Sequence, residues 1–431
     1  MNATAPILAD DAFRLLIAPV PTATFFERYF EREVLHAARA DAAYFAELYN
    51  VGCVEDALVM GADKPDQFVL IQHEGAEMAR EQMTSERSVI RFRSARQAAR
   101  SMTDPRSVLA AFAGGYTLNI KDAGAFHPPL AQLCNRIQAQ LGFYVHANGY
   151  FTPANAQGFG THYDTHDTLI VQIEGQKDWQ VYDPVVVLPF EMQPYSSSVH
   201  DGKLGAPRKI RLEAGDSLYI PRGYSHAAAT SDVRSLHITF ALAPIRVLDL
   251  VDSLMQLAAL GDAELRRGLP PGWHRDPTFA ARLSARLAEA LPRAIAAARI
   301  PLAAELTYNE MFAATRTTAA GMFDALAAFE RIRPNSRLRL RDDAPFHLRD
   351  RGDRLDIVLA AKVVSIPGTG RSAFARLMTG PATFAQIEAA LPADSAPDFV
   401  RSLLLEGLFV IDDAPLSERA ASVSDGFANR Y

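Results

Sequence analysis

The chain has few cysteines, no long apolar run and no strong excess of one charge. Only two of its 431 residues are cysteine, Cys53 and Cys134, so a disulfide scaffold is not expected and a reducing cytoplasm is the predicted location. No run of about 18 apolar residues occurs, so no membrane-spanning helix is expected. The N-terminus lacks a basic segment followed by a long apolar one, and we expect no signal peptide. A net charge of −6 argues against overall electrostatic attraction of the protein to nucleic acid or to an anionic membrane.

The composition is that of an ordinary soluble globular protein, with 49% hydrophobic and 22% charged residues. The length predicts two or three domains. Near the N-terminus, residues 22–38 place Phe25, Tyr29 and Val34 near one helical face, which predicts a core-facing helix. A second helix is predicted over 126–142, because prolines stand at its first turn and a glycine at its end.

Residues 143–243 differ from what precedes them. Short runs rich in Val, Ile, Tyr and Thr alternate with Gly, Asp and Pro. This pattern predicts about eight short strands, which favours a β-barrel or jelly roll. The predicted strands cover 145–152, 159–164, 168–174, 178–183, 208–212, 217–220, 225–229 and 234–242.

The pattern becomes helical again from about residue 245. Amphipathic Ala/Leu/Arg-rich stretches there have apolar faces wide enough to need a partner, either another chain or the rest of this one. Residues 335–431 read as strands, then two helices, then a helix leading into a strand. That order resembles a winged helix. Together with the strand-rich region, these segments predict an α+β protein.

Two metal-binding residue types lie close together in GFGTHYDTHDTLIV, at 158–171. On a strand His162 and Asp164 share a face, with Tyr163 on the opposite one. They offer one imidazole and one carboxylate to a single ion, and a third ligand must come from elsewhere. His226, in GDSLYIPRGYSH, is the best candidate, because a barrel brings a distant strand back beside the first.

Two histidines and one carboxylate on one face of an octahedron leave three positions open. That set is typical of non-haem Fe(II) oxygenases. A structural zinc site is normally closed by four ligands that usually include cysteine. Neither cysteine lies near this segment.

The strand-rich region is similar to a known enzyme family. The similarity to the cupin-type JmjC oxygenases lies in NGYFTPANAQGFGTHYDTHDTLIVQIEGQKDWQVYDP (148–184) and LEAGDSLYIPRGYSHAAA (212–229). The closest branch is the ribosomal oxygenases, which hydroxylate side chains of ribosomal proteins. LIAPVPTATFFERYFEREVLH (16–36) resembles their N-terminal region. The segment near 250–330 resembles their dimerisation region, and the end of the chain their winged helix.

The resemblance implies a fold and a division of the chain. The implied fold is a double-stranded β-helix (the cupin or JmjC jelly roll) with N-terminal helices, a helical dimerisation region and a C-terminal winged-helix-like domain. The implied domains are 1–245 (catalytic, with the N-terminal helical extension), 246–334 (dimerisation) and 335–431 (winged-helix-like).

The resemblance also implies a cofactor set. Family members use Fe(II), O₂ and 2-oxoglutarate, and release succinate and CO₂. Metal ligands are implied at His162, Asp164 and His226, with no further catalytic residue. The distal carboxylate of 2-oxoglutarate requires a cationic partner, and Lys177 stands where the family places it. Other implied cosubstrate contacts are Asn148, Tyr150 and Thr239.

Other polar residues near these positions have structural interpretations. His166 is expected at the pocket mouth or the surface, and Asp167 in an exposed turn or against substrate. A hydrogen-bonded core position is expected for His237, although a place near the cofactor is the alternative. Trp179 is expected to pack in the barrel wall, and Asp216 to form a turn. The sequence does not decide whether Tyr163 faces substrate or the outer layer.

The sequence therefore predicts an Fe(II)- and 2-oxoglutarate-dependent hydroxylase of a protein or peptide side chain, a ribosomal protein being the first guess. Alternatives are a tailoring hydroxylase of a ribosomally made natural-product peptide or small molecule, and a metal-binding cupin without oxygenase activity. A homodimer is expected. The arginines of residues 331–354 are interleaved with aspartates, which indicates a mixed solvated surface, so nucleic-acid binding by the C-terminal region is not favoured.

Overall fold

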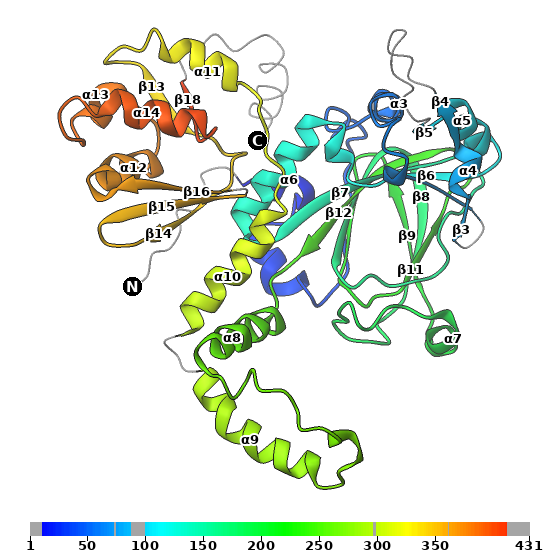
Figure 1. The fold of residues 1–431 in the computed structure, drawn as a ribbon. Coiled ribbons are helices and arrows are strands. Elements are labelled where there is room, and N and C mark those ends of the chain that lie inside the picture. Colours follow the sequence, from blue (N-terminus) through cyan, green and yellow to red (C-terminus); the bar gives the residue numbers. More distant parts are fainter. Residues whose placement is uncertain (1–10, 73–74, 88–99, 296–298, 361, 412–431) are drawn as a thin grey trace, which may run out of the picture.

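A computed structural model describes residues 11–72, 75–87, 100–295, 299–360 and 362–411 (Figure 1). Among these residues no helix combines the length and the apolar character needed to cross a bilayer. The cytoplasmic location stays a prediction.

Short elements surround one face of the sheet in the N-terminal part. The prediction of one helix over 22–38 is wrong. Helical structure ends at Tyr29, Glu31 has a positive φ of 58°, and strand β1 follows. Leu35 pairs with Tyr219 of a distant strand, and this non-local pairing outweighs the local helical pattern. The elements are α1 (Arg14–Ile17), α2 (Thr22–Thr24), η1 (Phe25–Tyr29), β1 (Leu35–Ala37), α3 (Val51–Met60), β2 (Phe68–Gln72), β3 (Ala76–Glu77), α4 (Arg80–Met83), β4 (Thr84–Arg87), β5 (Arg100–Thr103), α5 (Pro105–Ala113), β6 (Thr117–Ile120), η3 (Ala123–Ala125) and α6 (Pro128–Leu141).

Helix α6 confirms the second predicted helix. Pro128 and Pro129 occupy its first turn, where a missing N–H costs nothing. Gly142 ends it with a φ of 69°, a conformation that glycine adopts without steric cost.

Antiparallel strands form the centre of the molecule. Two of the predicted strands, 168–174 and 178–183, are one continuous strand, β8. The stretch 159–164 is not a strand and makes only one isolated bridge, at His162. The elements of this region are β7 (Tyr144–Thr152), β8 (Asp167–Val181), α7 (Ser197–His200), β9 (Arg208–Glu213), β10 (Ser217–Ile220), β11 (His226–Ala229) and β12 (Ser235–Ala243).

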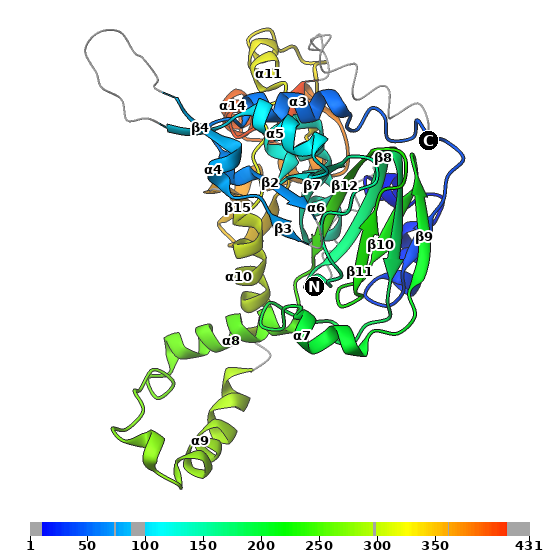
Figure 2. The same cartoon turned by 90° about the vertical axis from the view of Figure 1, so that its right-hand side faces the viewer.

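Strand β8 connects two sheets. The main strand order is β1-β10-β8-β12-β7-β6-β2-β3, and β9 and β11 pair with the second half of β8. The change of partner falls at Gly175, whose φ is 69°. A Cβ there would lie 1.9 Å from the carbonyl oxygen of Arg234, so only glycine fits. The bend turns β8 across both sheets and closes the barrel seen in Figure 2.

Alternation along β12 separates the core from the barrel interior. Its residues Leu236, Ile238, Phe240 and Leu242 join the apolar core that the sheet shares with the N-terminal helices and α6. The residues between them face the interior of the barrel, where a second cluster is buried, comprising Ile170, Trp179, Val181, Leu212, Leu218 and Ile220. The predicted α+β architecture with an antiparallel β-barrel is therefore confirmed.

Helices follow the barrel and extend away from it. They are α8 (Val247–Gly261), α9 (Phe279–Ala294), α10 (Ile300–Ala313) and α11 (Met322–Phe329). Figure 1 shows α8 and α9 projecting below the barrel, whereas α10 runs back toward α6 and the C-terminal part.

The C-terminal part has its own apolar core. Helix α11 packs against α14 and β18, so this core begins before residue 335. The winged-helix assignment stays a prediction. The elements are β13 (Arg337–Leu340), β14 (His347–Asp350), β15 (Arg354–Leu359), β16 (Lys362–Pro367), α12 (Arg371–Met378), β17 (Ala382–Thr383), α13 (Phe384–Glu388), α14 (Ala396–Leu405) and β18 (Phe409–Ile411).

Candidate metal centre

Three side chains converge at one end of the barrel. One possible ligand atom from each of His162, Asp164 and His226 lies within 4.8 Å of the others. Backbone pairing holds the two histidines together: His162 N–H donates to His226 O (3.1 Å), and His226 N–H donates to His162 O (2.7 Å). Asp164 follows two residues later, with its Oδ2 3.7 Å from Nε2 of His226. The structure thus brings together all three predicted ligands.

Hydrogen bonds orient both imidazoles in the same way. Nδ1 of His162 lies 2.8 Å from Gly160 O, and Nδ1 of His226 lies 3.0 Å from Tyr224 O. Each Nδ1–H therefore donates to a carbonyl, which leaves the Nε2 lone pair for an ion.

Electrostatics keep His226 and Asp164 in metal-binding protonation states. Burial, with the neighbouring His162, lowers the pKa of His226 to about 4, so this imidazole is neutral at physiological pH. Burial acts to raise the pKa of Asp164, but the nearby imidazoles, His226 foremost, outweigh it and the net shift is downward. Thr168 Oγ1 donates to Asp164 Oδ2 at 3.1 Å. The aspartate is therefore an anion.

Lys177 is buried in the same barrel without a carboxylate. It is 5% exposed, and within the described residues its Nζ donates only to Thr152 Oγ1, at 2.9 Å. Burial lowers its pKa to about 7. An unpaired buried cation is costly, which indicates that an anion completes this position.

The other predicted pocket residues share the interior face with Lys177. Asn148 and Tyr150 alternate along β7, and Thr239 stands opposite Asn148 on β12. Burial, with the charge of Asp164, raises the pKa of Tyr150, and the amides of Asn148 and Asn119 oppose that shift. Tyr150 therefore stays a neutral phenol.

Sequence reasoning missed one polar residue of this interior, Asn119, and misjudged the hydrogen bonding of another, His237. Asn119 lies on β6 directly opposite Tyr150, and its Oδ1 has no hydrogen-bond partner in the described protein. Its strand lies outside the segment from which the barrel was predicted. His237 was expected to be hydrogen-bonded, but its buried Nδ1 has no partner there either. Its ring stacks on Tyr150 at 4.9 Å and meets Trp179 at 5.7 Å.

Several neighbouring residues have structural roles. The expectation for Asp167 is wrong: it is fully buried and accepts the Arg222 backbone N–H at 2.8 Å. Asp216 holds a turn, as predicted, because it accepts the backbone N–H of Glu213 at 3.2 Å. Tyr163 faces the outer layer, where its hydroxyl donates to Gln193 O at 3.0 Å. Trp179 is buried inside the barrel, as expected.

A pocket of about 260 Å³ opens beside the triad. Thr165 and His166, which follow Asp164, form one side, so His166 lies at a pocket as predicted. The opposite wall comes from α10. The lining is completed by Tyr144, Glu191, Arg222, Ala243, Pro244, Ile245, Arg246, Asp249, Thr307, Glu310 and Met311.

The part of the chain that carries the triad is similar to a known domain family. Residues 121–250, which include the whole triad, match the family model described as "JmjC domain". This part of the chain is thus similar to JmjC domains.

Curated proteins similar to this chain are named as ribosomal oxygenases and histidyl-hydroxylases. It is 32% identical over 272 residues to "Ribosomal oxygenase 1" of Homo sapiens, covering 60% of this chain and 39% of that protein. It is 30% identical over 262 residues to "Bifunctional lysine-specific demethylase and histidyl-hydroxylase NO66" of Drosophila mojavensis, covering 59% and 28%. The chain thus spans less than half the length of these curated relatives.

Solved structures share the fold of this chain over most of its length. The ribosomal oxygenase YcfD of Escherichia coli, in complex with cobalt and 2-oxoglutarate, matches with a TM-score of 0.52 and 16% identity. The match covers 91% of this chain and 99% of YcfD. The resemblance to the JmjC ribosomal oxygenases is confirmed.

Proposed function

We propose that this chain is an Fe(II)- and 2-oxoglutarate-dependent oxygenase that hydroxylates an amino-acid side chain of a protein or peptide. One observation carries the proposal. The triad of His162, Asp164 and His226 and the unpaired buried cation Lys177 lie in the same barrel, joined through Trp179, whose ring is 6.0 Å from that of His226.

The donor set fits a divalent iron. His162 and His226 supply imidazole nitrogens and Asp164 supplies a carboxylate oxygen, the facial set that leaves positions open for other ligands. When bound there, the iron supplies activation of O₂. The protein contributes the fixed orientation of both rings through their Nδ1 hydrogen bonds.

The barrel interior fits a dicarboxylic keto acid. Protonated Lys177 binds the distal carboxylate, and Asn148, Tyr150 and Thr239 line its path from neighbouring strands. Two further buried polar atoms lack a partner in the described protein, Nε1 of Trp179 and Nδ1 of His237. A polar ligand, or water held beside it, satisfies such groups. The complex of YcfD with cobalt and 2-oxoglutarate supports this assignment.

The substrate enters from the pocket beside Asp164. Its walls join the barrel end, the first turn of α8 and helix α10. The names of the curated relatives, which include histidyl-hydroxylase and ribosomal oxygenase, support a protein side chain, with a ribosomal protein as the first candidate.

The regions outside the barrel have separate proposed roles. We propose a catalytic domain at 1–245, a helical dimerisation domain at 246–334 and a winged-helix-like domain at 335–431, with α11 at the end of the second packed against the third. Exposed apolar side chains on α8 and α9 support a homodimer: Val247 is 78% exposed, Leu260 75% and Leu291 39%.

Binding of nucleic acid is not favoured, because C-terminal arginines are matched by acids. Arg341 pairs with Asp343 at 2.7 Å and Arg371 with Asp350 at 2.7 Å. Such pairs reduce the positive charge available to phosphates.

The decisive test is coupled turnover. The purified chain with Fe(II), 2-oxoglutarate and O₂ is incubated with ribosomal proteins, and mass spectrometry follows the gain of one oxygen atom while succinate is quantified. Hydroxylation with matching succinate supports the proposal. Succinate without any protein modification would favour the natural-product or small-molecule alternative. No 2-oxoglutarate turnover under any condition would leave a metal-binding cupin.

A further inference from the structure

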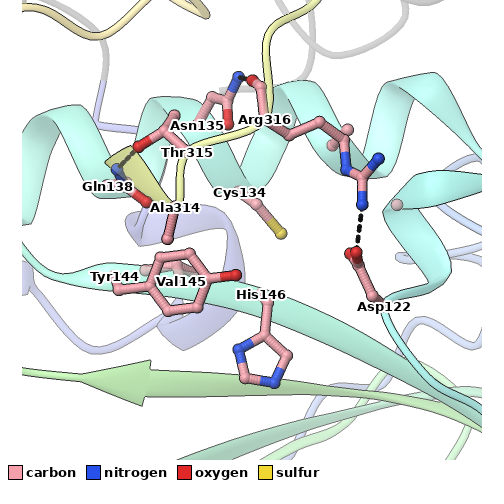
Figure 3. A pocket seen from close by; sticks show the side chains of 12 residues that line it. Asp122, Cys134, Asn135, Gln138, Tyr144, Val145, His146, Ala314, Thr315 and Arg316 are labelled. Carbon is pink, nitrogen blue, oxygen red and sulfur yellow. Dashed lines mark hydrogen bonds and ion pairs between the residues drawn. The ribbon is translucent and has the colours of Figure 1, made fainter. Parts of the chain in front are cut away.

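The linker between α10 and the C-terminal part crosses helix α6 next to the start of β7. A pocket of about 160 Å³ lies between them, and Figure 3 shows its lining. Linker residues Ala314, Thr315 and Arg316 form one side of this pocket, and Tyr144 and His146 of β7 form another. A segment from outside the JmjC domain therefore packs against the strand that carries Asn148.

Two buried side-chain amides of α6 bind this linker, one at its backbone and one at a side chain. Nδ2 of Asn135 donates to the carbonyl oxygen of Arg316 at 2.7 Å, and Nε2 of Gln138 donates to Oγ1 of Thr315. Asn135 is 4% exposed and Gln138 1% exposed. These contacts do not involve the Arg316 side chain, so the course of the linker is fixed without it.

The Arg316 side chain points away from this anchor toward Asp122. Its guanidinium forms an ion pair with the Asp122 carboxylate, drawn as a dashed line in Figure 3. Asp122 stands at the end of β6 in the left-handed conformation, with φ 49° and ψ 57°. That conformation is unfavourable for a residue other than glycine, although aspartate and asparagine tolerate it best. The ion pair thus adds to the backbone hydrogen bonds that hold Asp122 in this conformation.

The backbone of Asp122 contacts the proposed cosubstrate pocket. Its N–H donates to Oδ1 of Asn148 at 2.9 Å. Because Oδ1 of Asn148 accepts this hydrogen bond, the Nδ2 group at the other end of the amide is directed away from Asp122. Nδ2 is the donor end of the side chain. Tyr150, on the same face, lies within reach of that amide.

We propose that Arg316 is a positioning residue for 2-oxoglutarate binding. By fixing Asp122, it fixes the Asn148 amide with its donors toward the cosubstrate. This role rests on the proposed function. It also links the cosubstrate pocket to α10, which lines the substrate pocket, because the linker follows α10 directly.

The ion pair itself contributes little to the stability of the fold. The side chains of Arg316 and Asp122 are 45% and 38% exposed, and pairs this exposed have small net free energies. A purely structural role would therefore leave the ligand affinity unchanged when the pair is removed. A positioning role predicts a selective loss of 2-oxoglutarate affinity in a protein that remains folded.

The test compares Arg316→Ala with Asp342→Asn in the full chain loaded with Mn(II). Asp342 pairs with Arg136 of α6 at 3.4 Å at the same interface, without a described contact to Asp122. Calorimetry measures the 2-oxoglutarate dissociation constant, and the Mn(II) affinity and the melting temperature are measured beside it. We expect Arg316→Ala to weaken 2-oxoglutarate binding by up to about fivefold with Mn(II) affinity unchanged. Asp342→Asn should bind like the wild type.

Two further variants keep the test decisive. Arg316→Lys retains a cation and should recover most of the affinity. Asp122→Asn retains a residue type that tolerates the left-handed conformation but removes the charge that Arg316 pairs with, so it should weaken 2-oxoglutarate binding even if Arg316→Ala does not fold.

Different failures have different meanings. If the wild type binds 2-oxoglutarate and both Arg316→Ala and Asp122→Asn bind it with the same affinity, the role of Arg316 is overturned but the proposed function is not. An equal loss in Asp342→Asn would show general loosening of the interface, and would overturn it too. A wild-type chain that binds Mn(II) but no 2-oxoglutarate would overturn the proposed function itself.

Discussion

His162 and His226 are joined by two backbone hydrogen bonds, of 3.1 and 2.7 Å, that bring a loop and strand β11 into contact. The pairing sets the separation of the two imidazoles, whose ring centroids are 4.6 Å apart. The proposed metal site is therefore built on main-chain geometry, and replacing one side chain should remove a ligand without moving the other.

His162→Ala should lose metal but keep the fold. Removing one of three protein ligands should weaken Mn(II) binding by more than about 100-fold, a larger effect than that of a residue supporting a ligand. His166→Ala is the matched control, because His166 lies close to the site but outside the triad. Mn(II) binding is measured by electron paramagnetic resonance. Full affinity in His162→Ala, or an equal loss in His166→Ala, would contradict the ligand assignment.

Lys177→Met should weaken 2-oxoglutarate binding and stabilise the ligand-free protein. The lost charge-assisted hydrogen bond is worth about 1.5–3 kcal/mol, or roughly 10- to 150-fold in affinity. Without ligand the same cation is buried and unpaired, so its removal should raise the melting temperature. Calorimetry and thermal unfolding measure the two effects. Lys209→Met, on exposed β9, should change neither, and unaltered binding in Lys177→Met would identify another anchor.

Much of this site could be predicted because its signals are local. Alternation along β7 and β12 and the turn residues before His226 mark strands and their inward faces. The role of Lys177 was predicted from the family resemblance, and the structure shows that the side chain is buried in the barrel.

The errors arose where distant segments decide the local structure. Asp167 has the residue type of an exposed turn, but Arg222 comes from far along the chain to bury it. The pattern around Tyr29 is helical, yet the chain leaves the helix to pair with β10. His237 was expected to be hydrogen-bonded, but its neighbours are aromatic rings from β7 and β8. None of these neighbours can be read from a local window.

The affinity for 2-oxoglutarate should fall as pH rises above about 7. Burial lowers the pKa of Lys177 to about 7, below its ordinary value, so the ligand-free lysine loses its proton above that pH. The anionic ligand prefers the protonated form, and binding must then take up a proton. Calorimetry from about pH 6.5 to about pH 9, a range that spans the lysine pKa of about 7, measures the trend. Mn(II) affinity, followed in parallel, reports any change at the metal ligands, and a pH-independent 2-oxoglutarate affinity would contradict the role of Lys177.

The same pKa predicts how stability depends on pH without ligand. The folded pKa of Lys177 is depressed, so between about 7 and its ordinary value of 10.5 the unfolded chain binds more protons than the folded one. Stability therefore rises with pH across that window. Urea unfolding at several pH values should show a steeper rise for the wild type than for Lys177→Met. Parallel curves would show that Lys177 is not the titrating group.

Gly175→Ala should destabilise the barrel. A Cβ would clash with the Arg234 carbonyl, and the φ of 69° disfavours any side chain there, so a loss of at least about 2 kcal/mol is expected. Gly202→Ala is the control, because nothing lies within 4 Å of a Cβ at that exposed position. Urea unfolding measures both. Because the bend at Gly175 directs Lys177 into the barrel, the 2-oxoglutarate affinity of Gly175→Ala should fall together with its stability. Equal stability in Gly175→Ala and Gly202→Ala would show that β8 crosses the sheets by another route.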